Sequence, residues 1–185
     1  MFKHVPNILT MLRFVLIPFI FIAIIHSDYV LAFILLTLSG ITDILDGFIA
    51  RKFNFITNFG KLIDPIADKL TQFTIAITLL FTYPLAWVLL IIIVLKDGML
   101  GIVGLYLYDY GLKIKGASWW GKIATAYFYF VVIILIGYHI PDTFASQLMI
   151  ITSSALMLLS FVLYAKELKQ MIKEKDKLVD EQKRN

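Results

Sequence analysis

The chain has 185 residues, of which 60% are hydrophobic, and its mean hydropathy is +0.86. A soluble domain contains about 45–50% apolar residues, and a chain this short cannot bury helices that are apolar on every side. The composition therefore excludes a soluble globular domain and predicts an all-α integral membrane protein. The lack of cysteine excludes disulfides and thiol ligands, and the net charge of +4 suits an anionic membrane surface.

Six apolar stretches are long enough to cross a bilayer as helices, because about 20 residues suffice. They are residues 8–26, 30–51, 61–81, 85–108, 119–138 and 143–165. The basic and apolar N-terminal stretch lacks a small-residue cleavage site, so we expect it to be retained as the first span. We assign residues 1–166 to one membrane domain. Residues 167–185 form a charged tail, which we interpret as a solvated helical extension rather than a lipid-binding patch.

The distribution of basic residues predicts the orientation of these spans. The loops at 26–29, 81–84 and 137–143 contain no Lys or Arg. Basic residues lie instead at the two termini, in the loops at 52–60 and 109–118, or on the adjoining halves of the spans. The positive-inside rule therefore puts both termini in the cytoplasm. Because no basic stripe with interleaved aromatic residues occurs outside the tail, we expect no nucleic-acid partner.

Four aspartates interrupt the second and third predicted spans. One carboxylate near the middle of a membrane helix costs on the order of 2.5–3.5 kcal/mol, so four need compensation. Asp43 and Asp46 are three residues apart, and Asp64 and Asp68 are four apart, so each pair lies on one helix face. The short loop between the spans brings both pairs together near the cytoplasmic boundary. This oxygen-rich cluster suits Mg²⁺ or Mn²⁺ and has enough carboxylates for two ions.

Small residues and an arginine accompany the aspartates. Gly47 and Ala50 leave a bare groove on the second span, where a bulky ligand can approach the backbone. Gly60 lies one turn before Asp64, and Arg51 can pair with a phosphate or a carboxylate. Close helix packing is the alternative role for the small residues. Their interleaving with four aspartates favours a ligand site.

Together these positions form the pattern Asp-x2-Asp-Gly-x2-Ala-Arg-x8-Gly-x3-Asp-x3-Asp, which runs from Asp43 to Asp68. It resembles the signature of the CDP-alcohol phosphotransferase family at every specified position. The resemblance implies that an acceptor hydroxyl displaces CMP from a CDP-linked donor. It also implies that Asp43, Asp46 and Asp64 ligate metal, while Asp68 ligates a second ion and acts as the base. Further motif positions would line the CDP site: Asp43, Gly47, Ala50, Arg51 and Gly60.

The N-terminal segment PNILTMLRFVLIP is similar to the opening of the phosphatidylglycerophosphate synthases of that family. Asn7, Thr10 and Arg13 lie at three-residue spacing, so they share one helix face and point their polar groups toward the same end as the aspartates. We include these three residues among the CDP-binding candidates. Helix capping at the interface is the alternative role for Asn7 and Thr10.

Three lysines are relevant to binding of the acceptor. Lys96 precedes Asp97 in the fourth span, and the two form either a structural ion pair or a site where Lys96 binds a substrate phosphate. The segment KGASWWGKIAT resembles the GKxKT segment of phosphatidylglycerophosphate synthases, with Ala124 replacing one lysine. Lys96, Lys115 and Lys122 are therefore candidate ligands of an acceptor phosphate. The Lys-Asp pair departs from the Arg-Glu of those synthases, and cardiolipin synthases of the family tend toward Arg-Asp.

The sequence thus predicts a membrane enzyme of phospholipid biosynthesis, with its active site facing the cytoplasm. It would transfer a phosphatidyl group from CDP-diacylglycerol to glycerol 3-phosphate, releasing CMP. The alternative acceptor is phosphatidylglycerol, as in cardiolipin synthase. A divalent-cation transporter is the alternative of another class, but the carboxylates gather near one face, and the outer half lacks comparable charges. The resemblance also implies a homodimer embedded among membrane lipids.

Overall fold

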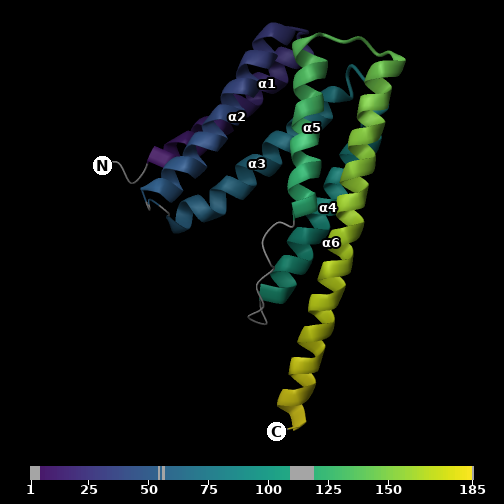
Figure 1. Ribbon diagram of the computed structural model, residues 1–185. Coiled ribbons are helices and arrows are strands. Elements are labelled where there is room, and N and C mark those ends of the chain that lie inside the picture. The colour runs from purple at the N-terminus through teal and green to yellow at the C-terminus, as the bar shows by residue number, and fades with distance from the viewer. Residues whose placement is uncertain (1–4, 54, 56, 109–118, 185) are drawn as a thin grey trace.

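The computed structural model describes residues 5–53, 55, 57–108 and 119–184, and this part of the chain is all-helical (Figure 1). The elements are α1 (Val5–Ile25), α2 (Tyr29–Lys52), α3 (Asn58–Leu79), α4 (Ala86–Tyr108), α5 (Trp119–Gly137) and α6 (Phe144–Arg184). The prediction of an all-α protein is confirmed. The helix α6 continues without a break through residue 166, so the boundary between membrane domain and tail stays a prediction.

Five of the helices are long and apolar enough to cross a membrane, so the chain has the composition of a multi-pass membrane protein. The exception is α3, although residues 61–81 were expected to form a span. The physical reason is charge, because this helix of 22 residues carries Lys61, Asp64, Asp68 and Lys69. Only its second half is predominantly apolar.

The main contacts between helices follow a ring. The helix α1 packs against α2 and α3, α2 packs against α5, α3 against α4, and both α4 and α5 against α6. In Figure 1, α1 and α2 lie side by side, and α6 extends beyond the other helices toward the C-terminus. Side chains from every helix form the buried apolar core, among them Ile20, Leu36, Ile75, Leu89, Phe128 and Met157.

Two glycines allow α5 to pack closely against its neighbours. A Cβ atom at Gly121 would lie 2.5 Å from the hydroxyl oxygen of Tyr164 in α6. A Cβ atom at Gly137 would lie 2.7 Å from the ring of Phe33 in α2. A side chain at either position would therefore force the facing aromatic ring or its helix to shift.

Short loops with capping side chains fix the helix ends. Asp28 accepts a hydrogen bond from the Leu31 amide at 3.1 Å and caps α2, while Thr57 accepts one from the Gly60 amide at 2.9 Å and caps α3. Tyr83, in the loop before α4, donates to the carbonyl of Ile140 in the loop before α6. Burial raises the pKa of Tyr83 to about 12, so this phenol remains a donor at neutral pH.

Candidate active site

Arg13 joins α1 to both aspartates of α2. Its guanidinium forms an ion pair with Asp43, and its Nη2 lies 2.8 Å from Asp46 Oδ2. The Arg13 side chain is 3% exposed and that of Asp46 is 5% exposed, whereas that of Asp43 is 51% exposed. A charge buried this deeply is tolerated only when it is paired, so Arg13 and Asp46 depend on each other. The expectation that Asp43 and Asp46 share one helix face is confirmed.

Thr10 joins the aspartates of α2 to those of α3. Its hydroxyl oxygen is fully buried and lies 2.6 Å from Asp64 Oδ1 and 3.2 Å from Asp46 Oδ2. The two carboxylates therefore converge on one hydroxyl group. One turn along α1, Asn7 accepts a hydrogen bond from the Thr57 hydroxyl at 3.0 Å, which fixes the start of α3 against α1. Side chains of α1 therefore join the carboxylates of α2 to Asp64 of α3.

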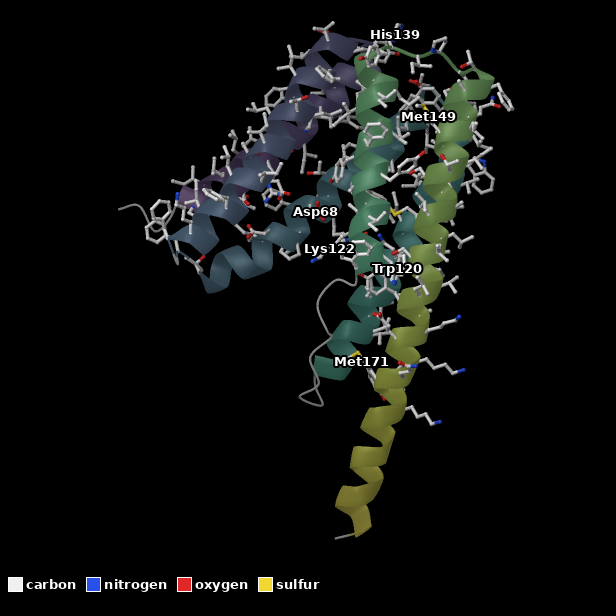
Figure 2. The ribbon with its side chains drawn as sticks, in the orientation of Figure 1. Asp68, Trp120, Lys122, His139, Met149 and Met171 are labelled. Carbon is white, nitrogen blue, oxygen red and sulfur yellow. The ribbon has the colours of Figure 1, made fainter. Side chains whose placement is uncertain are left out.

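A cavity of about 350 Å³ extends from these residues between α2, α3 and α5. Arg13, Asp43 and Asp68 line it, and Tyr129 of α5 donates a 3.4 Å hydrogen bond to Asp68 Oδ1. Figure 2 shows Asp68 between the α1–α2 hairpin and α5. The rest of the wall is largely apolar: Leu36, Ser39, Gly40, Ile44, Thr71, Ala126, Val132 and Ile133. Such a cavity offers carboxylates at one part of its wall and a hydrocarbon-like surface at another.

The chemistry of the donor set fits a hard divalent cation. Asp43, Asp46 and Asp64 gather on Arg13 and Thr10 of α1, Asp68 lines the adjoining cavity, and the chain contains no cysteine. In the described part of the chain, however, no three acidic or histidine side chains lie close enough to share one ion. The guanidinium of Arg13 instead bridges Asp43 and Asp46. Asp43, Asp46, Asp64 and Asp68 would hold the cations once that guanidinium moved.

The small motif residues lie at different places. Gly60 is buried against Asn7, because a Cβ atom there would lie 2.8 Å from the Asn7 amide oxygen. This contact favours the packing role for Gly60. Gly47 and Ala50 are half-buried on α2 and do not line the cavity. Arg51 belongs to α2 by its backbone, and its side chain lies outside the described part of the structure.

The three candidate acceptor lysines are not brought together. Lys96 is 2% exposed, and its ammonium lies 3.6 Å from Met157 Sδ and 3.7 Å from Asp97 Oδ1. It does not line the cavity, and Asp97 is held more closely by Lys69 of α3, at 2.8 Å. Lys122 is exposed in the first turn of α5, and Lys115 lies outside the described residues. Ala126, one turn beyond Lys122, lines the cavity. Lys122 is therefore better placed than Lys96 to reach a ligand there.

Sequence reasoning missed Tyr129 and Gly40. Tyr129 belongs to an apolar predicted span with several other aromatic residues, and nothing in its spacing distinguishes it from a core residue. Gly40 lies three residues before Asp43, which was the one local signal that it shares the aspartate face.

Comparison with known proteins identifies the family. The family model for CDP-alcohol phosphatidyltransferase matches residues 3–168. The chain belongs to the CDP-alcohol phosphatidyltransferase family. It is 46% identical over 81 residues to a CDP-diacylglycerol–glycerol-3-phosphate 3-phosphatidyltransferase from Rickettsia felis, covering 42% of this chain and 45% of that protein.

Two other relatives extend the comparison, one with the same name and one with a different name. A protein with the same name from Haemophilus influenzae is 32% identical over 128 residues, covering 66% of this chain and 69% of that protein. A probable CMP-forming cardiolipin synthase from Drosophila melanogaster is 43% identical over 94 residues, covering 50% of this chain and 29% of that protein. The matching stretch thus spans less than half the length of the Rickettsia and Drosophila relatives.

Proposed function

We propose that this protein transfers a phosphatidyl group from CDP-diacylglycerol to glycerol 3-phosphate, forming phosphatidylglycerophosphate and CMP. The observation that carries the proposal is the convergence of Asp43, Asp46 and Asp64 on two side chains of α1, beside a cavity with an apolar wall that Asp68 also lines. Relatives named for this reaction support the choice of donor and acceptor. The product would enter phospholipid biosynthesis.

The reaction assigns a task to each carboxylate. Asp43, Asp46 and Asp64 would hold the metal ions, with Asp68 as a further ligand. When bound, Mg²⁺ or Mn²⁺ would neutralise the diphosphate and stabilise the charge on departing CMP. Asp68 would take the proton of the acceptor hydroxyl as its oxygen bonds to the phosphatidyl phosphorus, while the bond from that phosphorus to CMP breaks. The hydroxyl of Tyr129 would hold Asp68 in place at the cavity wall.

The apolar part of the cavity suits the lipid portion of the donor. Leu36, Ile44, Val132 and Ile133 line it beside the polar residues Asp43 and Asp68. A CDP-linked lipid has the same division between a charged head and a hydrocarbon tail. The nucleotide end would lie against α1 and α2, where Asn7, Thr10, Arg13, Gly47, Ala50 and Arg51 are the proposed contacts.

The acceptor phosphate would bind near the first turn of α5. Lys122 is exposed there, one turn before the cavity residue Ala126. Lys115 precedes it in the chain, and both lysines are suited to an anionic acceptor. Figure 2 shows Lys122 nearer than Asp68 to the end of the bundle at which α5 begins.

The same proposal includes the topology in a cell membrane. All six helices would cross it, with α3 shielded by its neighbours so that its charges face the site rather than lipid. Both termini and the aspartates would lie on the cytoplasmic side, as the absence of Lys and Arg from the opposite loops indicates. Two copies would pair as a homodimer. Cysteines introduced singly at Ser27 and Lys122 test the topology, because a membrane-impermeant thiol reagent should label the first only from outside and the second only from inside.

Cardiolipin synthesis with phosphatidylglycerol as acceptor is the second candidate, and the Drosophila relative favours it. Release of CMP separates the two. The purified protein in detergent would receive CDP-diacylglycerol and one acceptor at a time, with and without Mg²⁺ or Mn²⁺. We expect release with glycerol 3-phosphate and metal only. Release with phosphatidylglycerol alone would support the second candidate, and no release with either acceptor would contradict both.

A further inference from the structure

Arg13 is bound to the carboxylates that the proposed function assigns to metal ions. Its two terminal nitrogens contact Asp43 and Asp46, and its own exposed fraction is only 2%. Asp46 has no other cationic partner among the ion pairs of the described residues. The guanidinium is therefore the counterion that allows this carboxylate to remain buried.

The same guanidinium is incompletely satisfied where it lies. Its Nε is buried and has no hydrogen-bond partner in the described part of the chain. Arg13 also lines the 350 Å³ cavity together with Asp43 and Asp68. A guanidinium with an unused donor beside a cavity is suited to a phosphate, which accepts several hydrogen bonds in the plane of the fork.

Divalent cations and Arg13 cannot share these oxygens at close range, because like charges repel strongly in a site shielded from water. The carboxylates would nevertheless stay together if the guanidinium moved. Thr10 lies within hydrogen-bond distance of both Asp46 and Asp64, and the contact between Asn7 and Thr57 fixes α1 against the start of α3. Only the long side chain of Arg13 needs to change position.

We infer that Arg13 is an exchangeable counterion: it neutralises Asp43 and Asp46, yields them to divalent cations, and then binds a phosphate of the CDP-linked donor. This inference rests on the proposed function for the metal and donor. Arg13 thereby acts as a positioning residue with two successive partners. Exchange also makes a distinctive prediction, because loss of the guanidinium should strengthen metal binding and weaken nucleotide binding.

The test compares four full-length proteins purified in detergent: the natural chain, Arg13→Gln, Arg13→Lys and Lys69→Gln. Mn²⁺ affinity is measured by electron paramagnetic resonance, and CDP affinity in saturating Mn²⁺ by calorimetry. Hydrogen bonds between charged groups make a roughly tenfold change the expected scale. Arg13→Gln should bind Mn²⁺ about tenfold more tightly and CDP about tenfold more weakly.

The two other variants separate charge from position. Lys69→Gln removes a nearby cation whose ion pair is with Asp97 on α4, at 2.8 Å. Its charge acts on Asp68 only through space, so this variant should change both affinities much less than Arg13→Gln does. Arg13→Lys keeps the charge but cannot bridge two carboxylates with one planar group, so its Mn²⁺ affinity should lie between those of the natural chain and Arg13→Gln.

Thermal unfolding with and without Mn²⁺ accompanies each measurement. Arg13→Gln leaves Asp46 without its cation, so Mn²⁺ should stabilise it more than the natural chain. If Arg13→Gln does not fold even with Mn²⁺, the Mn²⁺ affinity of Arg13→Lys tests the exchange instead.

The natural chain could bind Mn²⁺ while the Arg13 variants bind it no more tightly. That result would contradict the exchange but leave the proposed function standing. The loss of both Mn²⁺ and CDP affinity would mean that Arg13 only supports the structure, and it overturns the exchange as well. If the folded natural chain binds no Mn²⁺, the proposed function itself fails and the exchange fails with it.

Discussion

The surroundings of Arg13 and Lys96 differ, although each residue is a buried cation with 2% exposure. Arg13 contacts two carboxylates on another helix and lines a cavity. Lys96 packs against the sulfur of Met157, and its nearest carboxylate, Asp97, is 3.7 Å away and bound to Lys69. Burial of a charge therefore does not by itself mark a functional site in this protein. The partners and the access to a cavity distinguish the two regions.

The largest expected effect is a loss of turnover when Asp68, the cavity carboxylate that contacts Tyr129 of α5, is replaced. Asp68→Asn should lower turnover by at least about 10³-fold, because the variant loses both the base and a metal ligand. Binding of the CDP-linked lipid should be largely retained, since Asp43, Asp46 and Asp64 remain. CMP release and equilibrium binding measure the two properties. Near-normal turnover would show that Asp68 is not the base. It would also weaken the distinction between the Arg13 and Lys96 regions.

The cavity beside Arg13 can be filled without disturbing the packing. An added Cβ at Gly40 meets no atom within 4 Å, so Gly40→Leu should project into open space. We expect CMP release to fall roughly 10-fold to 100-fold through misplacement of the lipid. Stability should change by no more than about 0.5 kcal/mol.

Gly98→Leu is the matched control for Gly40→Leu. Gly98 is equally open and lines a different cavity, of about 510 Å³, between α3 and α4, beside Lys69 and Asp97. Its replacement should leave CMP release nearly unchanged. Equal losses in the two variants would show that the first cavity has no special part in the reaction.

Two lysines sharpen the comparison, because the sequence made both of them candidate ligands of the acceptor phosphate. Lys122→Met should raise the KM for the acceptor roughly tenfold, because a charged contact with its phosphate is lost. Lys96→Met should change that KM by less than about twofold, since an apolar side chain of similar volume replaces a buried cation and Asp97 keeps Lys69. Steady-state assays with varied acceptor provide both values. A larger increase in this KM for Lys96→Met would indicate that Lys96 binds the acceptor.

The smallest effect on catalysis is expected at the contact between α5 and α6. Gly121→Ala places a methyl group against Tyr164 and should destabilise the protein by about 1–3 kcal/mol. CMP release per folded molecule should stay near that of the natural chain. Gly101→Ala, where a Cβ meets nothing within 4 Å, is the control and should not lower stability. Thermal unfolding in detergent distinguishes the two, and equal stabilities would contradict the packing argument.

Local patterns predicted most of the fold. Apolar runs located α1, α2, α4 and α5 to within a few residues, because the length of a membrane helix is set by the bilayer. The helix α6 was expected to cross until residue 165 and to continue as a helical tail, and the helix extends to Arg184. The third helix was located, but its charged first half keeps it from having the composition of a membrane span. Hydropathy alone does not show that Asp64 meets Thr10 and that Asp68 meets Tyr129.

The sequence by itself determined the membrane class, the aspartate pattern and the family, since these depend on composition and on spacing along one helix or one hairpin. Only the tertiary structure decided which groups meet. It placed Arg13 on Asp43 and Asp46, gathered Asp46 and Asp64 at Thr10, brought Tyr129 to Asp68, and packed Lys96 against Met157. The reason is that helical periodicity fixes the face on which a side chain lies, whereas its partner depends on which helix packs against that face.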